Sequence, residues 1–263
     1  LSIDDYYGEL ASVNTRNMTK IQWAYPDDPQ PIYAYDETGE QIKQKLIDAG
    51  FVYDEAKNIM SYPEGYTDLM GAAYSGQVTI KMTLPSDAKD HPAGTIFVNA
   101  QEVLAKVGVK ADIEVDQNVL NKLSTAYDSG IQVWAAAWGS GGVDPDMFQI
   151  WYSDPAENQG TSPESTGLYS LFADGSDEQK AMLTELNSLI MAGRGTLDRE
   201  ERKPIYAQAL EIAGELAVQL PTYQRKNMFV FNKDVINAAT LFSGEDVTPF
   251  QGPLAYIWNV ELN

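Results

Sequence analysis

Hydrophobic residues recur along the middle of the chain with two different periods. Every second residue is apolar over residues 77–84, which predicts a β-strand, and again over residues 109–115, which predicts another. Between them, residues 92–106 carry apolar side chains three or four positions apart, the spacing of one helix face. A short helix is predicted over 118–127, and the apolar run at 131–138 predicts a strand buried on both faces. This alternation predicts an α/β layer with a largely parallel sheet.

Three further helices are predicted outside this layer. One covers residues 37–49, with Asp36 as its N-cap. The second follows a capping box over 176–179, because a serine and a glutamine three residues apart can each bond the backbone N–H of the other. The third is capped by Thr196 and has Pro204 inside its apolar pattern, so we expect a kink or a late start there.

The two ends of the chain have weaker patterns. Residues 1–32 contain three prolines within six positions and are expected to form an irregular lead-in segment. Residues 221–232 indicate extended chain. The tail, residues 238–263, is rich in turn residues and aromatic side chains. No internal repeat is present.

The connection that follows the last predicted strand holds the candidate site. The apolar run ends in Gly139-Ser140-Gly141-Gly142, where the backbone can turn sharply. Asp144, Pro145 and Asp146 then have the signature of a helix start, as N-cap, first position and first turn. Such a turn lies at the carboxyl edge of the sheet, where open α/β sheets bind ligands. A capped connection that binds nothing is the alternative.

Charge and composition narrow the range of partners. The 263 residues carry a formal net charge of −20, from 38 acidic and 18 basic side chains. Nucleic acid and anionic lipid are disfavoured as partners, because binding to either needs clustered lysine and arginine. The acidic excess favours either a cationic ligand or, more simply, solubility through charge repulsion. Cysteine is absent, which excludes disulfides, and no apolar run reaches the roughly 20 residues of a membrane span.

Familiar catalytic motifs are missing from the sequence. His91 is the single histidine, and its place in a polar turn is most simply interpreted as exposed and structural. Nucleotide-binding glycine motifs, clustered metal ligands and a nucleophile elbow do not occur. Asp144 and Asp146 could form an acid pair for hydrolysis, but two acids at a helix start are more typical of capping. We therefore expect a protein that is not an enzyme and that needs no cofactor or metal.

Four segments, taken in order, are similar to motifs of one known family. Residues 35–51 resemble its Y-D…A-G-[FY] helix, and residues 100–110 its A-Q-x-x-L helix with the following strand. Residues 138–148 resemble a loop that runs from a tryptophan to D-P-D-x-[FY], and residues 201–221 a late E-R-x-x-x-Y helix with its strand. Over about residues 33–225 the chain thus resembles the carboxyl-terminal portion of family 5 extracellular solute-binding proteins, the peptide-binding receptors of ABC importers.

The resemblance implies a periplasmic-binding-protein-like (type II) fold, in which two lobes enclose a ligand. This chain would supply the second lobe at residues 33–225, a mixed sheet flanked by helices, and a return segment at 226–263 that packs on a first lobe outside the chain. It would capture a peptide or peptide-like solute, or a sugar or other non-peptide solute, and deliver it to the membrane subunits of the importer. The resemblance also implies a monomer that is extracytoplasmic, either periplasmic or lipid-anchored at the cell surface.

The same resemblance assigns the binding site to the loop after the last strand. The expected ligand-binding residues are Trp134, Trp138, Gly139, Ser140, Gly141, Asp144, Asp146 and Phe148, with Trp151 and Tyr152 as further aromatic walls. Family members that hold a free peptide amino group use an aspartate three residues after the loop tryptophan. Gly141 occupies that position here. Either Asp144 or Asp146 takes its place, or the ligand lacks such an amine.

Overall fold

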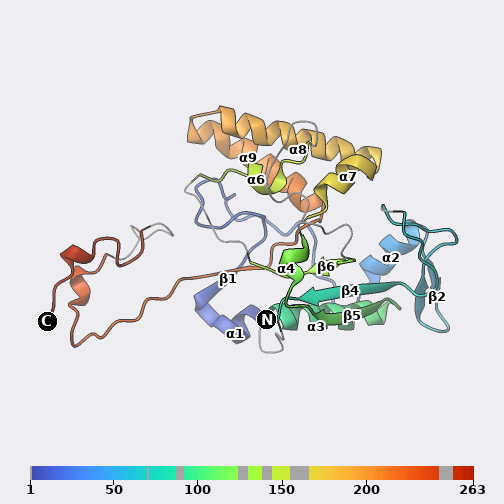
Figure 1. The fold of residues 1–263 in the computed structure, drawn as a ribbon, viewed down its shortest axis with the longest axis horizontal. Helices are drawn as coiled ribbons and strands as arrows, with labels where there is room; N and C mark the ends of the chain where they lie inside the picture. The colour runs from blue at the N-terminus through green and yellow to red at the C-terminus, as the bar shows by residue number, and fades with distance from the viewer. Residues whose placement is uncertain are drawn as a thin grey trace.

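A three-stranded parallel sheet forms the centre of the α/β layer (Figure 1). The computed structural model describes residues 2–69, 71–86, 92–123, 130–137, 144–154, 166–242 and 251–263. In the sheet, β4 (Thr79–Leu84) lies between β5 (Lys110–Val115) and β6 (Val133–Trp134), and it runs parallel to both. The crossover from β4 to β5 contains α3 (Pro92–Lys106), and α4 (Val119–Lys122) follows β5. The predicted alternation of strands and helices is confirmed.

Helix α3 packs on this sheet through the apolar face that its sequence predicts. Phe97 is buried together with Met82 and Leu84 of β4 and Ala111 of β5. Gln101 adds a polar contact, because its Nε2 donates to the carbonyl oxygen of Ala111 at 2.5 Å. Because the three strands are parallel, their carboxyl ends lie at one edge of the sheet.

The expectation that the last strand is buried on both faces is wrong for its described part. Val133 is 38% exposed and Trp134 is only half-buried. Among the described strands β6 pairs with β4 alone, through Met82↔Val133 and Thr83↔Trp134. An edge strand has one neighbour instead of two, so its side chains keep more contact with solvent.

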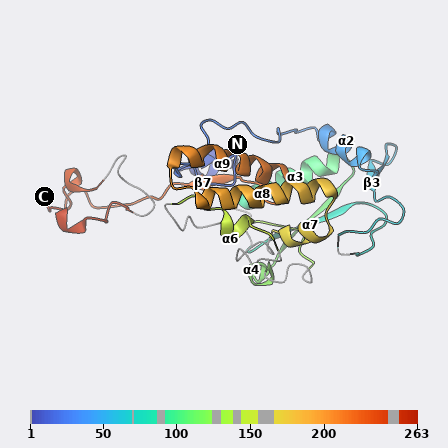
Figure 2. The same cartoon turned by 90° about the horizontal axis from the view of Figure 1, so that it is seen from above.

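A second layer consists of helices that gather on one side of the sheet (Figures 1 and 2). These are α6 (Phe148–Trp151), α7 (Leu168–Asp174), α8 (Asp177–Gly195) and α9 (Arg199–Glu215). Their shared core includes Leu183, Ile190 and Tyr206, all fully buried. The capping box before α8 is confirmed, because Gln179 N donates to Ser176 Oγ at 3.2 Å and Ser176 N donates to Gln179 Oε1 at 2.9 Å.

The start of α9 differs from the prediction. Asp198, and not Thr196, is its N-cap, and Asp198 Oδ1 accepts from the backbone N–H of Glu200 and Glu201. Thr196 instead closes α8, since its Oγ1 donates to the carbonyl oxygen of Ala192. The helix begins at Arg199 and continues through Pro204, so a late start is wrong. A helix of this length tolerates the single backbone bond that a proline removes when its other side chains are well packed.

The first residues are more ordered than expected. They form α1 (Ser2–Tyr7), a 3-10 turn η1 (Gly8–Leu10) and β1 (Ala11–Val13). β1 pairs antiparallel with β7 (Tyr223–Arg225), and we call this pair the β1–β7 ribbon. The expectation of an irregular lead-in is therefore wrong for residues 2–13, because the strand depends on a partner more than 200 residues away.

The rest of the lead-in has no helix or strand but is tied to the helical layer. Arg16 forms an ion pair with Glu211 of α9 at 2.7 Å, and Asn17 Nδ2 donates to the carbonyl oxygen of Gln219 at 2.9 Å. The next helix is α2 (Glu40–Asp48), where Asp36 accepts from the N–H of Gln41 at 2.8 Å although Gly39 is the N-cap residue. After it, β2 (Val52–Asp54) and β3 (Ile59–Ser61) form a hairpin that the sequence pattern did not indicate.

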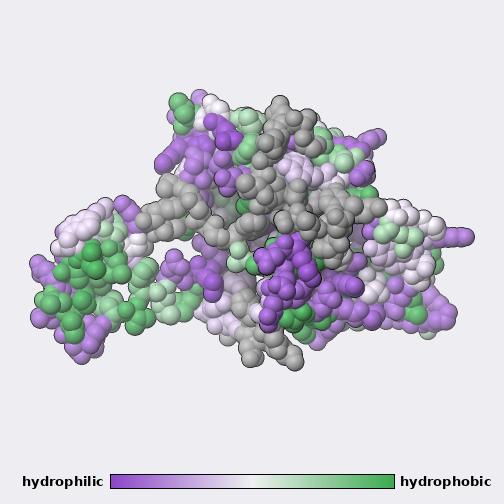
Figure 3. All heavy atoms as spheres, viewed as in Figure 1, coloured by the Kyte–Doolittle hydropathy of each residue, from purple (hydrophilic) through white to green (hydrophobic). Residues whose placement is uncertain are grey.

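The tail extends away from the two layers in both views (Figures 1 and 2). Its described part holds the 3-10 turns η3 (Ala238–Thr240) and η5 (Ile257–Asn259), and a bridge joins Ile236 to Leu262. Figure 3 shows hydrophobic residues gathered on its surface, and Trp258 is 73% exposed. No helix in the described ranges is both long and apolar enough to cross a membrane.

Candidate functional site

The predicted binding residues divide into two sets. Trp138, Gly139, Ser140 and Gly141 lie outside the described residues, so their predicted roles stay predictions. Trp134, Asp144, Asp146 and Phe148 are described, on β6 and on the segment that leads into α6.

Asp144 is held by an arginine of the helical layer. Arg202 of α9 donates from Nη1 to Asp144 Oδ2 at 2.7 Å and from Nη2 to Asp144 Oδ1 at 2.8 Å. The side chain of Arg202 is 10% exposed and that of Asp144 is 54% exposed. The predicted role of Asp144 as an N-cap is wrong, since α6 begins at Phe148 and its N-cap residue is Met147. A two-bond arginine–carboxylate pair is both stronger and more directional than a single cap bond.

Arg202 is itself fixed by aromatic neighbours. Its Nη2 also donates to the hydroxyl oxygen of Tyr206 at 2.7 Å, and its guanidinium lies 5.2 Å from the ring centres of Trp23 and of Tyr206. The hydrogen bond to Asp144 raises the pKa of Arg202 above its ordinary value, although burial acts in the opposite direction. Burial also raises the pKa of Tyr206. Arg202 therefore stays charged and anchors the segment before α6 to α9.

Asp146 makes a second, weaker anchor to the same layer. Its Oδ1 accepts from the backbone N–H of Phe148 at 3.1 Å, and its Oδ2 lies 3.5 Å from Nε of Arg194 on α8. The guanidinium of Arg194 lies 4.0 Å above the ring of Phe148. Both carboxylates of the proposed acid pair are thus turned toward arginines. This arrangement suits the positioning of a loop and gives little support to acid–base catalysis.

The aromatic side chains around α6 have different environments. Trp151 is 2% exposed and belongs to the core of the helical layer, so its expected place in a binding wall is wrong. Phe148 is half-buried and stacks on Tyr152, with ring centres 4.7 Å apart. Among the aromatics predicted for the site, Phe148 and Trp134 are half-buried in the described structure and could face a ligand.

A cavity next to α6 was not indicated by the sequence. It has a volume of about 330 Å³ and is lined by Tyr152, Asp154, Phe172, Thr184, Asn187, Ser188 and Met191. Asn187 is buried and accepts from the backbone N–H of Ser153 at 3.0 Å. Because polar α8 residues and two aromatic rings share this cavity, it could accommodate a small polar molecule. Within the described ranges no three histidine, cysteine or acidic residues are grouped to hold a metal.

Comparison with known proteins identifies the fold. No protein-family model and no curated protein sequence matches the chain. The oligopeptide-binding protein AppA from Bacillus subtilis, in complex with a nonapeptide, matches 100% of this chain with a TM-score of 0.63 at 16% identity. This match covers 44% of AppA. The chain has the type II periplasmic-binding-protein fold, in part.

Two further structures extend the likeness. The periplasmic binding protein DppA from Helicobacter pylori, in complex with the peptide STSA, matches 84% of this chain at 22% identity, with a TM-score of 0.51. NikZ from Campylobacter jejuni, in complex with Ni(L-His), matches 84% at 16% identity, with a TM-score of 0.54. The matches cover 35% and 39% of those chains, so this chain spans less than half the length of the type II proteins it resembles. The expected fold class is confirmed.

Proposed function

We propose that the chain is part of a solute-binding receptor that captures a peptide or peptide-like molecule for an ABC importer. The observation that carries the proposal is the match of the whole chain to a peptide-bound type II binding protein. The motif order over residues 33–225 supports the same hypothesis independently of the fold. We place the receptor outside the cytoplasm, where it would meet both its solute and the membrane subunits of the importer.

The segment 144–148 supports a binding role over a catalytic one. Asp144 is paired with Arg202, and Asp146 with Arg194, so both carboxylates are used to hold the segment in place. A segment anchored at two points keeps Phe148 in a fixed position, and a binding site gains affinity from such preorganisation. We infer that the predicted loop residues form one wall of the solute site.

The test is to identify what the natural protein retains. The longer receptor, of which we propose this chain is a part, would be purified without denaturation, and the molecules released on unfolding would be identified by mass spectrometry. We expect short peptides. A metal chelate of the kind bound to NikZ, or a sugar, would overturn the peptide assignment while leaving a solute receptor.

A second measurement separates the receptor from a hydrolase. The retained molecule would be incubated with the receptor and with its Asp146→Asn variant, and the mixture analysed for cleavage products. We expect no turnover with either protein. Turnover that disappears in the Asp146→Asn variant would overturn the receptor proposal.

A further inference from the structure

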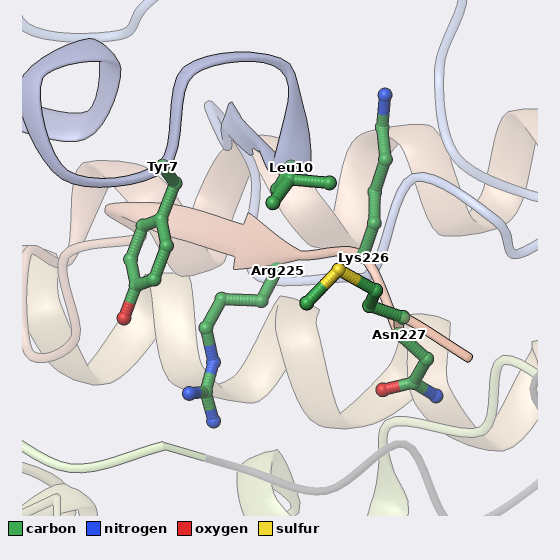
Figure 4. Close-up of a pocket in the computed structure, with 6 residues that line it drawn as sticks. Tyr7, Leu10, Arg225, Lys226 and Asn227 are labelled. Atoms are coloured by element: carbon green, nitrogen blue, oxygen red, sulfur yellow. The ribbon is translucent and has the colours of Figure 1, made fainter. Parts of the chain in front are cut away.

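A cavity with two positively charged residues lies at the end of the β1–β7 ribbon (Figure 4). Its volume is about 310 Å³, and it is lined by Tyr7, Leu10, Arg225, Lys226, Asn227 and Met228. The ribbon brings these two chain segments together, because Ala11 pairs with Arg225 and the N–H of Lys226 donates to the carbonyl oxygen of Leu10 at 2.7 Å. None of the lining residues belongs to the loop of the candidate site. We call it the ribbon cavity.

The two cations of the ribbon cavity are not neutralised by the part of the chain that the structure describes. Arg225 and Lys226 are exposed, and within that part neither side chain has an ion pair, although Arg16, Arg194 and Arg202 each have a carboxylate partner. Other cations, such as Lys20 and Arg199, also have no ion pair among the described residues, but Arg225 and Lys226 line a cavity. Two adjacent cations beside a cavity create a local positive potential that attracts an anion.

The other lining groups add hydrogen-bond donors and an apolar surface. Figure 4 shows the side chains of Tyr7 and Arg225 extending to the same side of the ribbon, with Lys226 on the opposite side. The ring of Tyr7 lies 5.7 Å from that of Tyr223, and burial raises the pKa of Tyr223 to about 12. Tyr223 therefore keeps its proton at neutral pH and adds no negative charge beside Arg225. Leu10 and Met228 provide the apolar wall.

We propose that the ribbon cavity binds a carboxylate, with the guanidinium of Arg225 as its two-bond partner. The Tyr7 hydroxyl and the Asn227 amide are the further donors. A planar guanidinium matches the two oxygens of a carboxylate, whereas a compact ammonium does not. The carboxylate has two possible sources, the carboxyl terminus of the solute and a free organic acid. The first source deepens the proposed function and depends on it, and the second does not.

The first experiment uses glutarate as the probe and residues 1–263 as the protein. Isothermal titration would compare wild type with Arg225→Gln, Arg225→Lys and Lys233→Gln. We expect Arg225→Gln to weaken glutarate binding at least tenfold and Arg225→Lys to weaken it less. Lys233→Gln removes the same charge from the tail, away from the cavity, and should leave binding unchanged. Glutarate affinity within twofold of wild type in Arg225→Gln, or inorganic phosphate binding as tightly as glutarate, would overturn the proposal.

The second experiment separates the two sources of the carboxylate. The longer receptor would be titrated with a pentapeptide that has either a free or an amidated carboxyl terminus. If the solute supplies the carboxylate, amidation weakens binding to wild type but not to Arg225→Gln. If amidation leaves the peptide affinity unchanged while Arg225→Gln weakens glutarate binding, the cavity binds a free acid. If the receptor binds the peptide, but Arg225→Gln changes the affinity for neither the peptide nor glutarate, this inference is wrong and the proposed function stands.

Discussion

Asp144 accepts hydrogen bonds from both terminal nitrogens of Arg202, at 2.7 and 2.8 Å, although 58 positions separate them in the chain. This pair connects the segment after the parallel sheet to α9 in the helical layer. Arg202 is buried and has Tyr206 and Trp23 as neighbours, so its charge has few other partners if Asp144 is lost. The pair therefore links the candidate loop to the stability of the layer.

Asp144→Asn is expected to lower the free energy of unfolding by about 1–3 kcal/mol, because a buried guanidinium loses its charged partner. Urea unfolding followed by circular dichroism would measure the change. Asp146→Asn is the matched control, since its distance to Arg194 is longer, at 3.5 Å, and Arg194 is more exposed than Arg202. We expect a loss of under about 1 kcal/mol there. Equal losses in the two variants would contradict the role assigned to Arg202.

Gly108 is expected to tolerate alanine poorly because the backbone of β3 approaches it closely. A Cβ at Gly108 would lie 2.6 Å from the backbone nitrogen of Met60 and 2.8 Å from the carbonyl oxygen of Asn58. Gly50 also has a left-handed backbone after a helix, with a φ of +90°, compared with +77° at Gly108. A Cβ at Gly50, however, would have no neighbouring atom within 4 Å. Gly108→Ala should therefore destabilise the protein by about 1–3 kcal/mol more than Gly50→Ala. Equal melting temperatures of the two variants would show that backbone strain alone, and not the close approach of β3, sets the cost of alanine.

Tyr223 should make stability fall in strongly alkaline solution. Its pKa is raised to about 12 in the folded protein, mainly by burial and then by Tyr7, whereas a tyrosine in the unfolded chain ionises near its ordinary value of 10. The unfolded state therefore holds fewer protons between about pH 10 and 12, and stability decreases as the pH rises through that window. Tyr223→Phe should flatten this decrease. An unchanged pH dependence of urea unfolding would mean that Tyr223 ionises normally.

Residues 233–263, which include the tail, should exchange their amide hydrogens faster than α8. This segment exposes a set of large apolar side chains, namely Val235, Leu254, Ile257, Trp258 and Leu262, whereas Leu186 and Ile190 of α8 are fully buried. Few buried contacts leave the backbone hydrogen bonds of a segment open to local unfolding. Hydrogen exchange measured by mass spectrometry on residues 1–263 would compare the two. Protection of the tail equal to that of α8 would contradict this expectation.

Gly141 tests whether the solute is held by its amino group. Both oxygens of Asp144 already accept from Arg202, so Asp144 is a poor replacement for the aspartate that the family carries at the Gly141 position. Gly141→Asp in the longer receptor should raise its preference for peptides with a free amino terminus over N-acetylated ones. A charge-assisted bond suggests a gain of roughly 1.5–3 kcal/mol before strain is deducted. A wild type that already prefers the free amine tenfold, with no gain in the variant, would contradict this.

Local signals in the sequence predicted the elements whose ends are set by local chemistry. Pro92 and Gly108 mark the two ends of α3, and the capping box at Ser176 marks the start of α8. These patterns report hydrogen bonds within a few residues, so they can be read without knowing the fold. The parallel sheet followed from the alternation of strands and helices, because a helix between two strands is the crossover that parallel pairing requires.

The elements that depend on distant partners could not be predicted in this way. β1 exists because β7 pairs with it, and no pattern near Ala11 indicates that partner. The role of Asp144 at the candidate site could not be predicted for the same reason. An aspartate before a proline is typical of a helix cap, and the local sequence does not show whether a distant arginine pairs with it. Arg202 stood within a recognised motif, but its sequence neighbours do not reveal the residue that it binds.

The β1–β7 ribbon also sets an order of events during synthesis. Residues 11–13 leave the ribosome more than 200 residues before the strand that completes them. The helix α3 and its strands can form long before that, because their contacts are closer in the chain. The ribbon must close a very long loop, so it is among the last parts to assemble, and until then β1 is an unpaired strand edge. During synthesis, residues 11–13 therefore depend on protection from aggregation for longer than the strands around α3 do.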